Sequence, residues 1–462
     1  MPRVGEGCYD TGLSGTAKYG IFLNDTDLKA LPGPSIIPRS EHNISRANIS
    51  PNALKVLYRL KSAGFEAFLV GGGVRDLLLG RHPKDFDVAT NADPDEIKDL
   101  FRNCRLIGRR FRLAHVRFGR DIVEVATFRA SGALPEEERA HSDSGRILRD
   151  NVYGSIGEDV WRRDFTVNAL YYNIADFTVW DYTSGVADVR ARTLRLIGDP
   201  QTRYREDPVR MLRAARFAAK LDFVLAPETA APIAELGRLL RDVPPARLFD
   251  ELLKLFHGGH AERSFDVLLQ YDLLRYLFAD TSAMIEGPNG AAMLEFIRRG
   301  LRNTDERIRA DKPVTPMFLY AVFLWFPIRE IAATLQREGW NEAQSVLEAS
   351  QRVLEQQQTS FPRRFSSPMK ELLAMQWRFT TGPRGIRAAR LLQHKRFRAA
   401  YDFLVLRSRC GEVDQATADW WTEIQELPPE DQQKAFGMKR RQGRRRRGGR
   451  RGPQGPINDA AG

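Results

Sequence analysis

The pattern of apolar and polar positions changes near residue 195. Before it, short apolar runs such as FEAFLV (65–70) and IVEVATF (122–128) alternate with turns and with two stretches of helical spacing, 50–64 and 93–104. After it, apolar residues recur at i, i+3 and i+4 in one segment after another, which predicts helices. The pattern therefore predicts an α+β chain, with a mixed α/β head followed by an all-α region.

Five segments follow from these changes. Residues 1–50 are rich in Gly, Pro, Ser and Asn and predict a loosely structured leader. We expect the head over 51–195, a helical neck over 196–265 and a helical body over 266–429. Residues 430–462 are expected to form a disordered, Arg-rich tail.

The charge is concentrated in that tail. The chain has 462 residues, 42% of them hydrophobic, and a net charge of +12. Nine basic residues and no acid lie between 439 and 451, so the rest of the chain carries only 12 − 9 = +3. An Arg run of this kind predicts a nucleic-acid-binding arm, and a solubility tail is the alternative. The nine residues are Lys439, Arg440, Arg441, Arg444, Arg445, Arg446, Arg447, Arg450 and Arg451.

Cysteine usage and the apolar runs bear on localisation. Cys8, Cys104 and Cys410 lie far apart and form no CxxC pair, which argues against a disulfide framework or a zinc site and favours a cytoplasmic protein. The longest apolar run, 316–328, is interrupted by proline and is too short to span a bilayer. We expect a buried helix there and no membrane insertion.

A glycine turn is the first candidate for binding chemistry. The GGG at 71–73 follows a predicted strand and precedes a predicted helix, but GxGxxG fails because Asp76 replaces the third glycine. No Walker-type P-loop is present either. Backbone N–H groups at such a turn can face a phosphate, and Arg75 could add a charge-assisted contact. A plain tight turn is the alternative.

Three acids on neighbouring predicted strands are candidates for binding a metal ion. Asp85 and Asp87 are one residue apart, so an extended chain directs both carboxylates to one side, where they repel unless a cation lies between them. Glu124 shares its face with Ile122 and Ala126, where burial is expected, so it should be paired or metal-bound. Three such acids predict a Mg²⁺-dependent phosphoryl-transfer site. A charged edge strand is the alternative for the first two.

Four ordered motifs then carry a resemblance. They are LVGGGVRDLLLGRHPKDFDVAT, VEVATFR, RRDFTVNALYY and GDPQTRYREDPVRMLRAARFAAKL, and they cover about 60–220. Together they resemble the class II nucleotidyltransferases, which include tRNA CCA-adding enzymes and bacterial poly(A) polymerases. Further stretches, CRLIGRRFRLAHV, LRDNVYGSIGED, PPARLFDELLKLF and KFRAAYDFLVLRSR, are similar to bacterial poly(A) polymerases over about 35–425.

The resemblance implies roles for particular residues. Asp85 and Asp87 would bind the metal, and the third catalytic acid would be either Glu124, with the better strand position, or Asp164. The triphosphate would be held by Gly71, Gly72 and Arg75, with Arg162 and Arg163 nearby.

The helix predicted over EDPVRMLRAARF would read the base. Glu206, Arg210, Arg213 and Phe217 fall on one stripe of this helix, and Met211, Leu212, Ala215 and Ala218 face the opposite way. Asp207 and Arg210 would contact the base edge, and Arg213 is a further candidate. A helix N-cap is the alternative role for Asp207.

The implied activity is template-independent addition of AMP from ATP to RNA 3′ ends, with two Mg²⁺ ions and release of pyrophosphate, in a pathway that promotes RNA turnover. A tRNA CCA-adding enzyme is the nearest alternative, and a non-catalytic RNA-binding scaffold is an alternative of another class. The basic tail would keep RNA bound, or would bind RNA-decay proteins instead.

Overall fold

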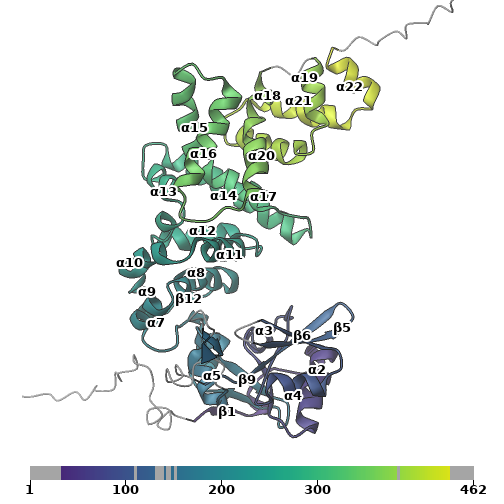
Figure 1. Cartoon of the computed structure of the whole chain (residues 1–462), viewed down its shortest axis with the longest axis vertical. Helices are drawn as coiled ribbons and strands as arrows, with labels where there is room; N and C mark the ends of the chain where they lie inside the picture. The colour runs from purple at the N-terminus through teal and green to yellow at the C-terminus, as the bar shows by residue number, and fades with distance from the viewer. Residues whose placement is uncertain are drawn as a thin grey trace, which may run out of the picture. The chain divides into compact units, whose positions relative to one another are not determined.

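The computed structural model describes residues 33–108, 112–130, 140–141, 147–149, 153–381 and 385–437 (Figure 1). The chain divides into two compact units. The first comprises Met1–Pro288, Arg298–Thr315 and Gln356–Phe361, and the second comprises Asn289–Ile297, Pro316–Glu355 and Pro362–Gly462. The expected head and neck therefore belong to one unit, whereas the sequence suggested a boundary between them near residue 195.

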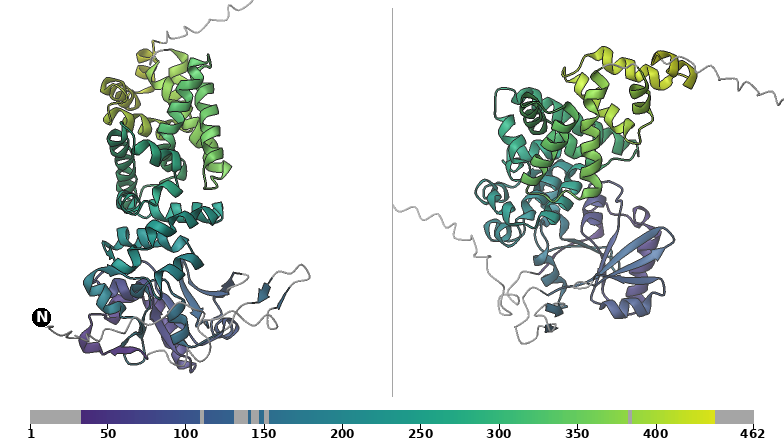
Figure 2. Two further views of the ribbon diagram at one scale, coloured as in Figure 1. Left: turned by 90° about the vertical axis from the view of Figure 1, so that its left-hand side faces the viewer. Right: turned by 45° about the horizontal axis from the view of Figure 1, so that its top comes forward.

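The first unit contains a mixed sheet with helices packed around it (Figure 2). The sheet has eight strands in the order β1-β10-β9-β2-β3-β6-β5-β4. Neighbouring strands are antiparallel except β3 and β6, which are parallel. The α+β class predicted from the sequence is confirmed. The strands are β1 Ser35–Ile37, β2 Ala67–Val70, β3 Asp87–Thr90, β4 Cys104–Ile107, β5 Leu113–Phe118, β6 Asp121–Thr127, β9 Leu170–Asn173 and β10 Val179–Asp181.

Strand β2 is buried along its whole length because helices cover both of its faces. Phe68 and Val70 pack in a cluster with Ile156 and Val160 of α5 (Ile156–Arg162). The alternate positions of the strand face the other way, and α2 (Pro51–Ser62) contacts β2, β3 and β6. A capping box formed by Ser155 and Glu158 fixes the start of α5.

The remaining elements of the first unit are mostly short helices. They are η1 Arg39–Glu41, η2 Arg46–Asn48, α3 Gly72–Leu78, α4 Pro94–Leu100, β7 Ala140–His141, β8 Ile147–Arg149, η4 Thr166–Asn168, α6 Gly185–Ala191, β11 Thr193–Leu194, α7 Pro200–Glu206, α8 Val209–Leu221, β12 Val224–Leu225, α9 Pro227–Ala230, α10 Ile233–Leu236, η5 Gly237–Asp242, α11 Pro245–Phe256, α12 Ala261–Gln270, η6 Leu274–Tyr276 and α13 Ala279–Ile285. Helix α14, Gly290–Arg309, contributes to both units.

The predicted base-recognition helix is in fact two helices. Helix α7 ends at Glu206 and α8 begins at Val209, so the expectation of one continuous stripe that includes Glu206 is wrong. Pro208 explains the break, because a residue before proline is disfavoured in the helical region. The apolar side is as expected, since all four of its residues are buried: Met211, Leu212, Ala215 and Ala218.

The second unit is helical. Its α15, Pro316–Arg337, is longer than the expected apolar run because the helix continues past Pro327. Within the described part of the chain it alone has the length and composition of a membrane span, but 67% of its most apolar window is buried, as in a core helix. The other helices are α16 Glu342–Gln356, α17 Arg363–Ala374, α18 Gln376–Thr380, α19 Ile386–Leu392, α20 Phe397–Arg409, α21 Gln415–Glu426 and α22 Pro429–Ala435.

Two expected terminal segments are shorter than predicted. Residues 33–50, assigned to the leader, include strand β1 and the buried Ile44 and Ile49. Residues 430–435, assigned to the tail, belong to α22. Both segments are therefore ordered, contrary to expectation. The nine basic tail residues lie outside the described residues.

Candidate active site

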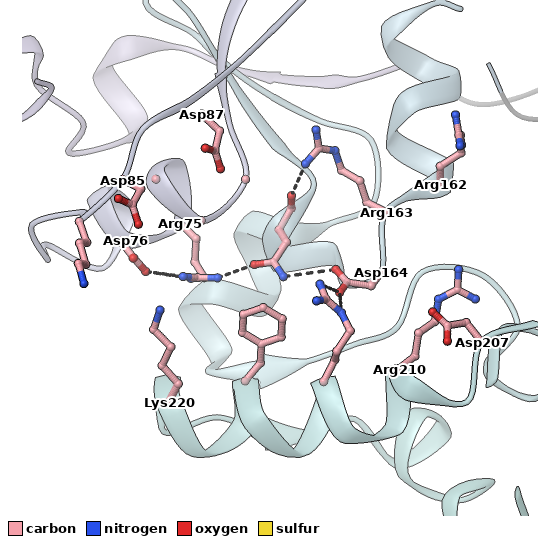
Figure 3. A pocket seen from close by; sticks show the side chains of 17 residues that line it. Arg75, Asp76, Asp85, Asp87, Arg162, Arg163, Asp164, Asp207, Arg210 and Lys220 are labelled. Carbon is pink, nitrogen blue, oxygen red and sulfur yellow. Dashed lines mark hydrogen bonds and ion pairs between the residues drawn. The ribbon is translucent and has the colours of Figure 1, made fainter. Parts of the chain in front are cut away.

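A pocket of about 500 Å³ lies in the first unit (Figure 3). Four segments line it: Gly71 with the first turns of α3, the start of β3 with the residues just before it, the end of α5 with the residues that follow it, and α8 with Asp207 just before it. Of the twelve catalytic and nucleotide-binding residues predicted from sequence, only Glu124 is not part of the lining. The other eleven are Gly71, Gly72, Arg75, Asp85, Asp87, Arg162, Arg163, Asp164, Asp207, Arg210 and Arg213.

Asp87 is crowded by other acids. It begins β3 and lies beside Glu124 in the parallel register of β3 and β6. Asp85 lies just before the strand, although the sequence placed it within the strand. Burial and the nearby charges of Glu124 and Asp85 raise the pKa of Asp87 to about 6, against a smaller lowering by Arg163. The electrostatic conflict expected from the sequence is therefore present.

Glu124 differs from expectation in its burial. The buried side of β6 carries Val123 and Val125, while Ile122 is 42% exposed. The Glu124 side chain is 48% exposed, and its Oε1 lies 3.5 Å from Nε2 of His115. The prediction that the Glu124 carboxylate is buried is therefore wrong. Its link to the site is its register with Asp87.

Asp164, the other candidate for the third acid, is held by neighbouring donors. Arg213 Nε donates to its Oδ2 at 2.8 Å, and the backbone N–H of Phe165 donates to its Oδ1 at 2.9 Å. The Asn168 amide donates to Oδ1 at 3.4 Å. The charge of Asp164 is thus balanced by Arg213 from α8, whereas Asp87 lies among acids.

Arg75 is part of the same network (Figure 3). Its Nε donates to Asp76 Oδ1 at 2.9 Å and its Nη1 to Asn168 Oδ1 at 2.5 Å. The residue is only 2% exposed. Asn168 in turn contacts Asp164, which binds Arg213, so the chain of polar contacts joins α3 through η4 to α8. The Arg75 guanidinium, which was predicted to bind a phosphate, is thus largely engaged in hydrogen bonds to Asp76 and Asn168.

The two predicted base-reading residues are also engaged. Asp207 accepts from Arg247 Nη2 at 2.7 Å through one oxygen and from the backbone N–H of Val209 at 3.2 Å through the other. The second contact is not an N-cap bond, because Pro208 is the N-cap of α8 and no side chain caps this helix, so the capping alternative for Asp207 is wrong. Arg210 Nη1 donates to Glu206 Oε2 at 2.9 Å and to the Arg203 carbonyl oxygen at 2.6 Å. Sequence reasoning gave no role to Arg247 or Arg203, because both contacts depend on tertiary packing.

Three basic side chains of the lining keep their charge available. Among the described residues, Lys84, Arg162 and Lys220 form no side-chain hydrogen bond or ion pair. Lys220 extends from α8 toward Asp76 (Figure 3). Burial and the charge of Arg75 lower the pKa of Lys220, partly offset by Asp76. Lys84 and Lys220 were missed from the sequence, although the position of Lys84 directly before Asp85 was an available signal.

Models of known families match three parts of the chain. Residues 67–195 match the "Poly A polymerase head domain", residues 222–285 the "Probable RNA and SrmB- binding site of polymerase A", and residues 338–452 the "Polymerase A arginine-rich C-terminus". The first match contains the glycine turn, the acids and Asp164. The third contains the predicted basic tail residues.

Curated relatives extend the match to most of the chain. Poly(A) polymerase I of Salmonella typhi is 49% identical over 411 residues, which is 87% of this chain and 88% of that protein. The chain belongs to the poly(A) polymerase I family. The corresponding enzyme of Haemophilus influenzae is 46% identical over 85% of this chain and 88% of its own length.

Relatives with the other activity match less of the chain. A CCA-adding enzyme of Levilactobacillus brevis is 39% identical over 51% of this chain and 57% of that protein. Among solved structures, a tRNA-processing enzyme in an apo form has a TM-score of 0.56 at 22% identity, covering 83% of this chain and 98% of that one. At that identity the likeness shows the fold alone, which is the predicted nucleotidyltransferase fold. The family predicted from the sequence motifs is confirmed.

Proposed function

We propose that this protein adds AMP from ATP to the 3′ ends of RNA without a template and releases pyrophosphate. The observation that carries the proposal is that one pocket of about 500 Å³ combines the acid pair, the glycine turn and Asp207 and Arg210, which were predicted to read the base. Family membership supports the same reaction. Such tails would promote RNA turnover.

We infer that Mg²⁺, in two ions, would bind at the acid cluster. Asp85 and Asp87 supply oxygen ligands of the kind that Mg²⁺ prefers. The described residues assemble no group of three or more His, Cys, Asp or Glu side chains suited to a metal, so substrate phosphates and water would complete the coordination. When bound, the ions would activate the attacking hydroxyl and stabilise the charge on the leaving pyrophosphate. Glu124 is the better third acid, because it lies beside Asp87 while Asp164 is paired with Arg213.

The rest of the pocket would position the nucleotide. Lys84 and Lys220, with Arg162, have free charge for the triphosphate, and Gly71 and Gly72 allow close approach of phosphate to the backbone. Arg75 would act mainly by fixing Asn168 and, through it, Asp164. Asp207 and Arg210, held by Arg247 and Glu206, would present fixed polar atoms to the base. Phosphoryl transfer needs mostly such positioning and charge.

The charge of the C-terminal basic residues indicates the binding partners of the protein. The basic residues between 439 and 451 would bind RNA through its phosphates, and the alternative is that they bind RNA-decay proteins. We place the reaction in the cytoplasm, because Cys8, Cys104 and Cys410 lie far apart in the sequence and form no CxxC pair.

The acid pair provides the direct test of the site. We expect an Asp85→Ala/Asp87→Ala variant to lose AMP incorporation into an RNA oligonucleotide by roughly a thousandfold or more, because it lacks the metal-binding carboxylates. An Asp250→Ala variant, which removes an exposed acid of α11, should keep wild-type activity. Full incorporation by the double variant would refute this active site, and an inactive wild-type protein would favour a non-catalytic RNA-binding scaffold.

A further inference from the structure

Arg163 is held by two side chains that the proposed mechanism does not use. Its Nε donates to the Tyr171 hydroxyl at 2.8 Å, and its Nη2 donates to Asp159 Oδ2 at 3.0 Å. The Tyr171 hydroxyl donates to that same Asp159 oxygen at 2.6 Å. The three groups therefore form a closed triangle in which each contacts the other two.

Tyr171 is otherwise a core residue. It is fully buried on β9 in a cluster with Phe68 and Val160. Burial raises the pKa of its hydroxyl well above the ordinary value, so Tyr171 is neutral and can both donate and accept. A phenylalanine would fill the same apolar space. Packing alone therefore does not require the hydroxyl. Its hydrogen bonds to Arg163 and Asp159 suggest that it orients the Arg163 side chain.

The guanidinium group is held at the wall of the pocket. Nη1 donates to the Asn168 carbonyl oxygen at 3.3 Å and lies 3.5 Å from the place that a β-carbon on Gly71 would occupy. The charge of Arg163 also reaches Asp87, whose pKa it lowers. A guanidinium has five N–H groups, so these contacts leave one on each terminal nitrogen. Arg163 thus lies beside the glycine turn in the lining of the pocket, where a triphosphate would bind.

We propose that Tyr171 and Asp159 are positioning residues that hold the Arg163 guanidinium beside the glycine turn, with its remaining N–H groups directed to the triphosphate of the incoming nucleotide. This inference rests on the proposed function. It predicts that the two residues affect the affinity for the triphosphate moiety and not for the nucleoside.

The strand offers a matched control. Tyr171→Phe removes one hydroxyl from β9, and Tyr172→Phe makes the same change at the next residue, which is equally buried and faces the opposite side of the sheet. Dissociation constants for α,β-methylene-ATP and for adenosine are measured by calorimetry with Mg²⁺ present. We expect Tyr171→Phe and Asp159→Asn to weaken binding of the ATP analogue about three- to tenfold, the usual range for one lost hydrogen bond, and to leave adenosine binding unchanged. Tyr172→Phe should change neither constant.

Arg163→Gln then tests whether the effect acts through Arg163. If it does, Tyr171→Phe adds nothing further in the Arg163→Gln background, so the two changes are not additive. Wild-type affinity of Tyr171→Phe for the analogue, equal weakening toward adenosine, additive effects, or wild-type analogue binding by Arg163→Gln itself would each overturn the inference. These results are distinct from failure of the proposed function, which would appear as absence of AMP incorporation by the unmodified protein.

Discussion

Replacing Asp87 with asparagine should stabilise the metal-free protein while it abolishes activity. The pKa of Asp87 is about 6 against an ordinary 3.8, with burial, Glu124 and Asp85 as the causes. The folded state therefore binds more protons than the unfolded state between these values, so stability falls as the pH rises from about 4 to 6 and stays reduced above 6. The full shift of 6 − 3.8 = 2.2 units corresponds to about 3 kcal/mol. Partial exposure of Asp87 reduces the expected gain for Asp87→Asn to about 1–2 kcal/mol at pH 8.

The assay is unfolding by urea, followed by tryptophan fluorescence in EDTA at pH 5 and at pH 8. Trp161 and Trp180 pack against the hydrophobic cluster of the head that contains Phe68 and Tyr171, so their fluorescence reports on the head. The variant should gain about half as much stability at pH 5 as at pH 8, because at pH 5 the wild type has lost only part of the stability that deprotonation of Asp87 removes. An Asp250→Asn control should change little at either pH. Mg²⁺ should stabilise the wild type more than the variant, because ligand binding to the folded state raises stability. A variant less stable than wild type at pH 8, or equal stabilisation of both by Mg²⁺, would refute the account of the acid cluster.

Three further predictions concern other parts of the chain. Gly185→Ala should lower stability by several kcal/mol in urea titrations, since its β-carbon would collide with backbone of η4, whereas Gly33→Ala has open space and should be neutral. Lys220→Gln should raise KM for ATP and weaken product inhibition by pyrophosphate, each about three- to tenfold in a steady-state assay, because it removes a positive charge from the pocket. The exposed control Lys61→Gln should have little effect in the same assay. Deleting 438–452 should lower RNA affinity and flatten its dependence on salt; an unchanged salt slope would favour the protein-binding alternative.

Local patterns were enough to predict much of the head. The glycine turn, the strand that begins at Asp87 and the helix from Pro51 all carry short-range signals: turn residues, alternation and a Ser50 N-cap. The ordered motifs and their resemblance to a known family then brought the distant Asp164 and Arg210 to the same site. Most of the residues predicted in this way do line one pocket.

What the sequence could not give depends on contacts between distant segments. The exposure of Glu124 reflects which side of β6 the helices cover, and alternation alone leaves that choice open. Strand β1 pairs with β10, more than a hundred residues away, so its segment shows no local strand signal. The role of the Tyr171 hydroxyl could not be predicted, because the residue lies in an apolar strand and the hydroxyl's partners, Arg163 and Asp159, come from another segment of the chain.

Nucleotide choice tests the central claim most directly. The purified protein is incubated with Mg²⁺, each of the four nucleoside triphosphates in turn, and either an RNA oligonucleotide or a tRNA that lacks its 3′-terminal nucleotides, and the products are resolved by length. The account predicts repeated AMP addition to both RNAs, with one pyrophosphate released per residue added and little use of CTP. Incorporation of CMP into the truncated tRNA, followed by one AMP and a stop, would contradict it.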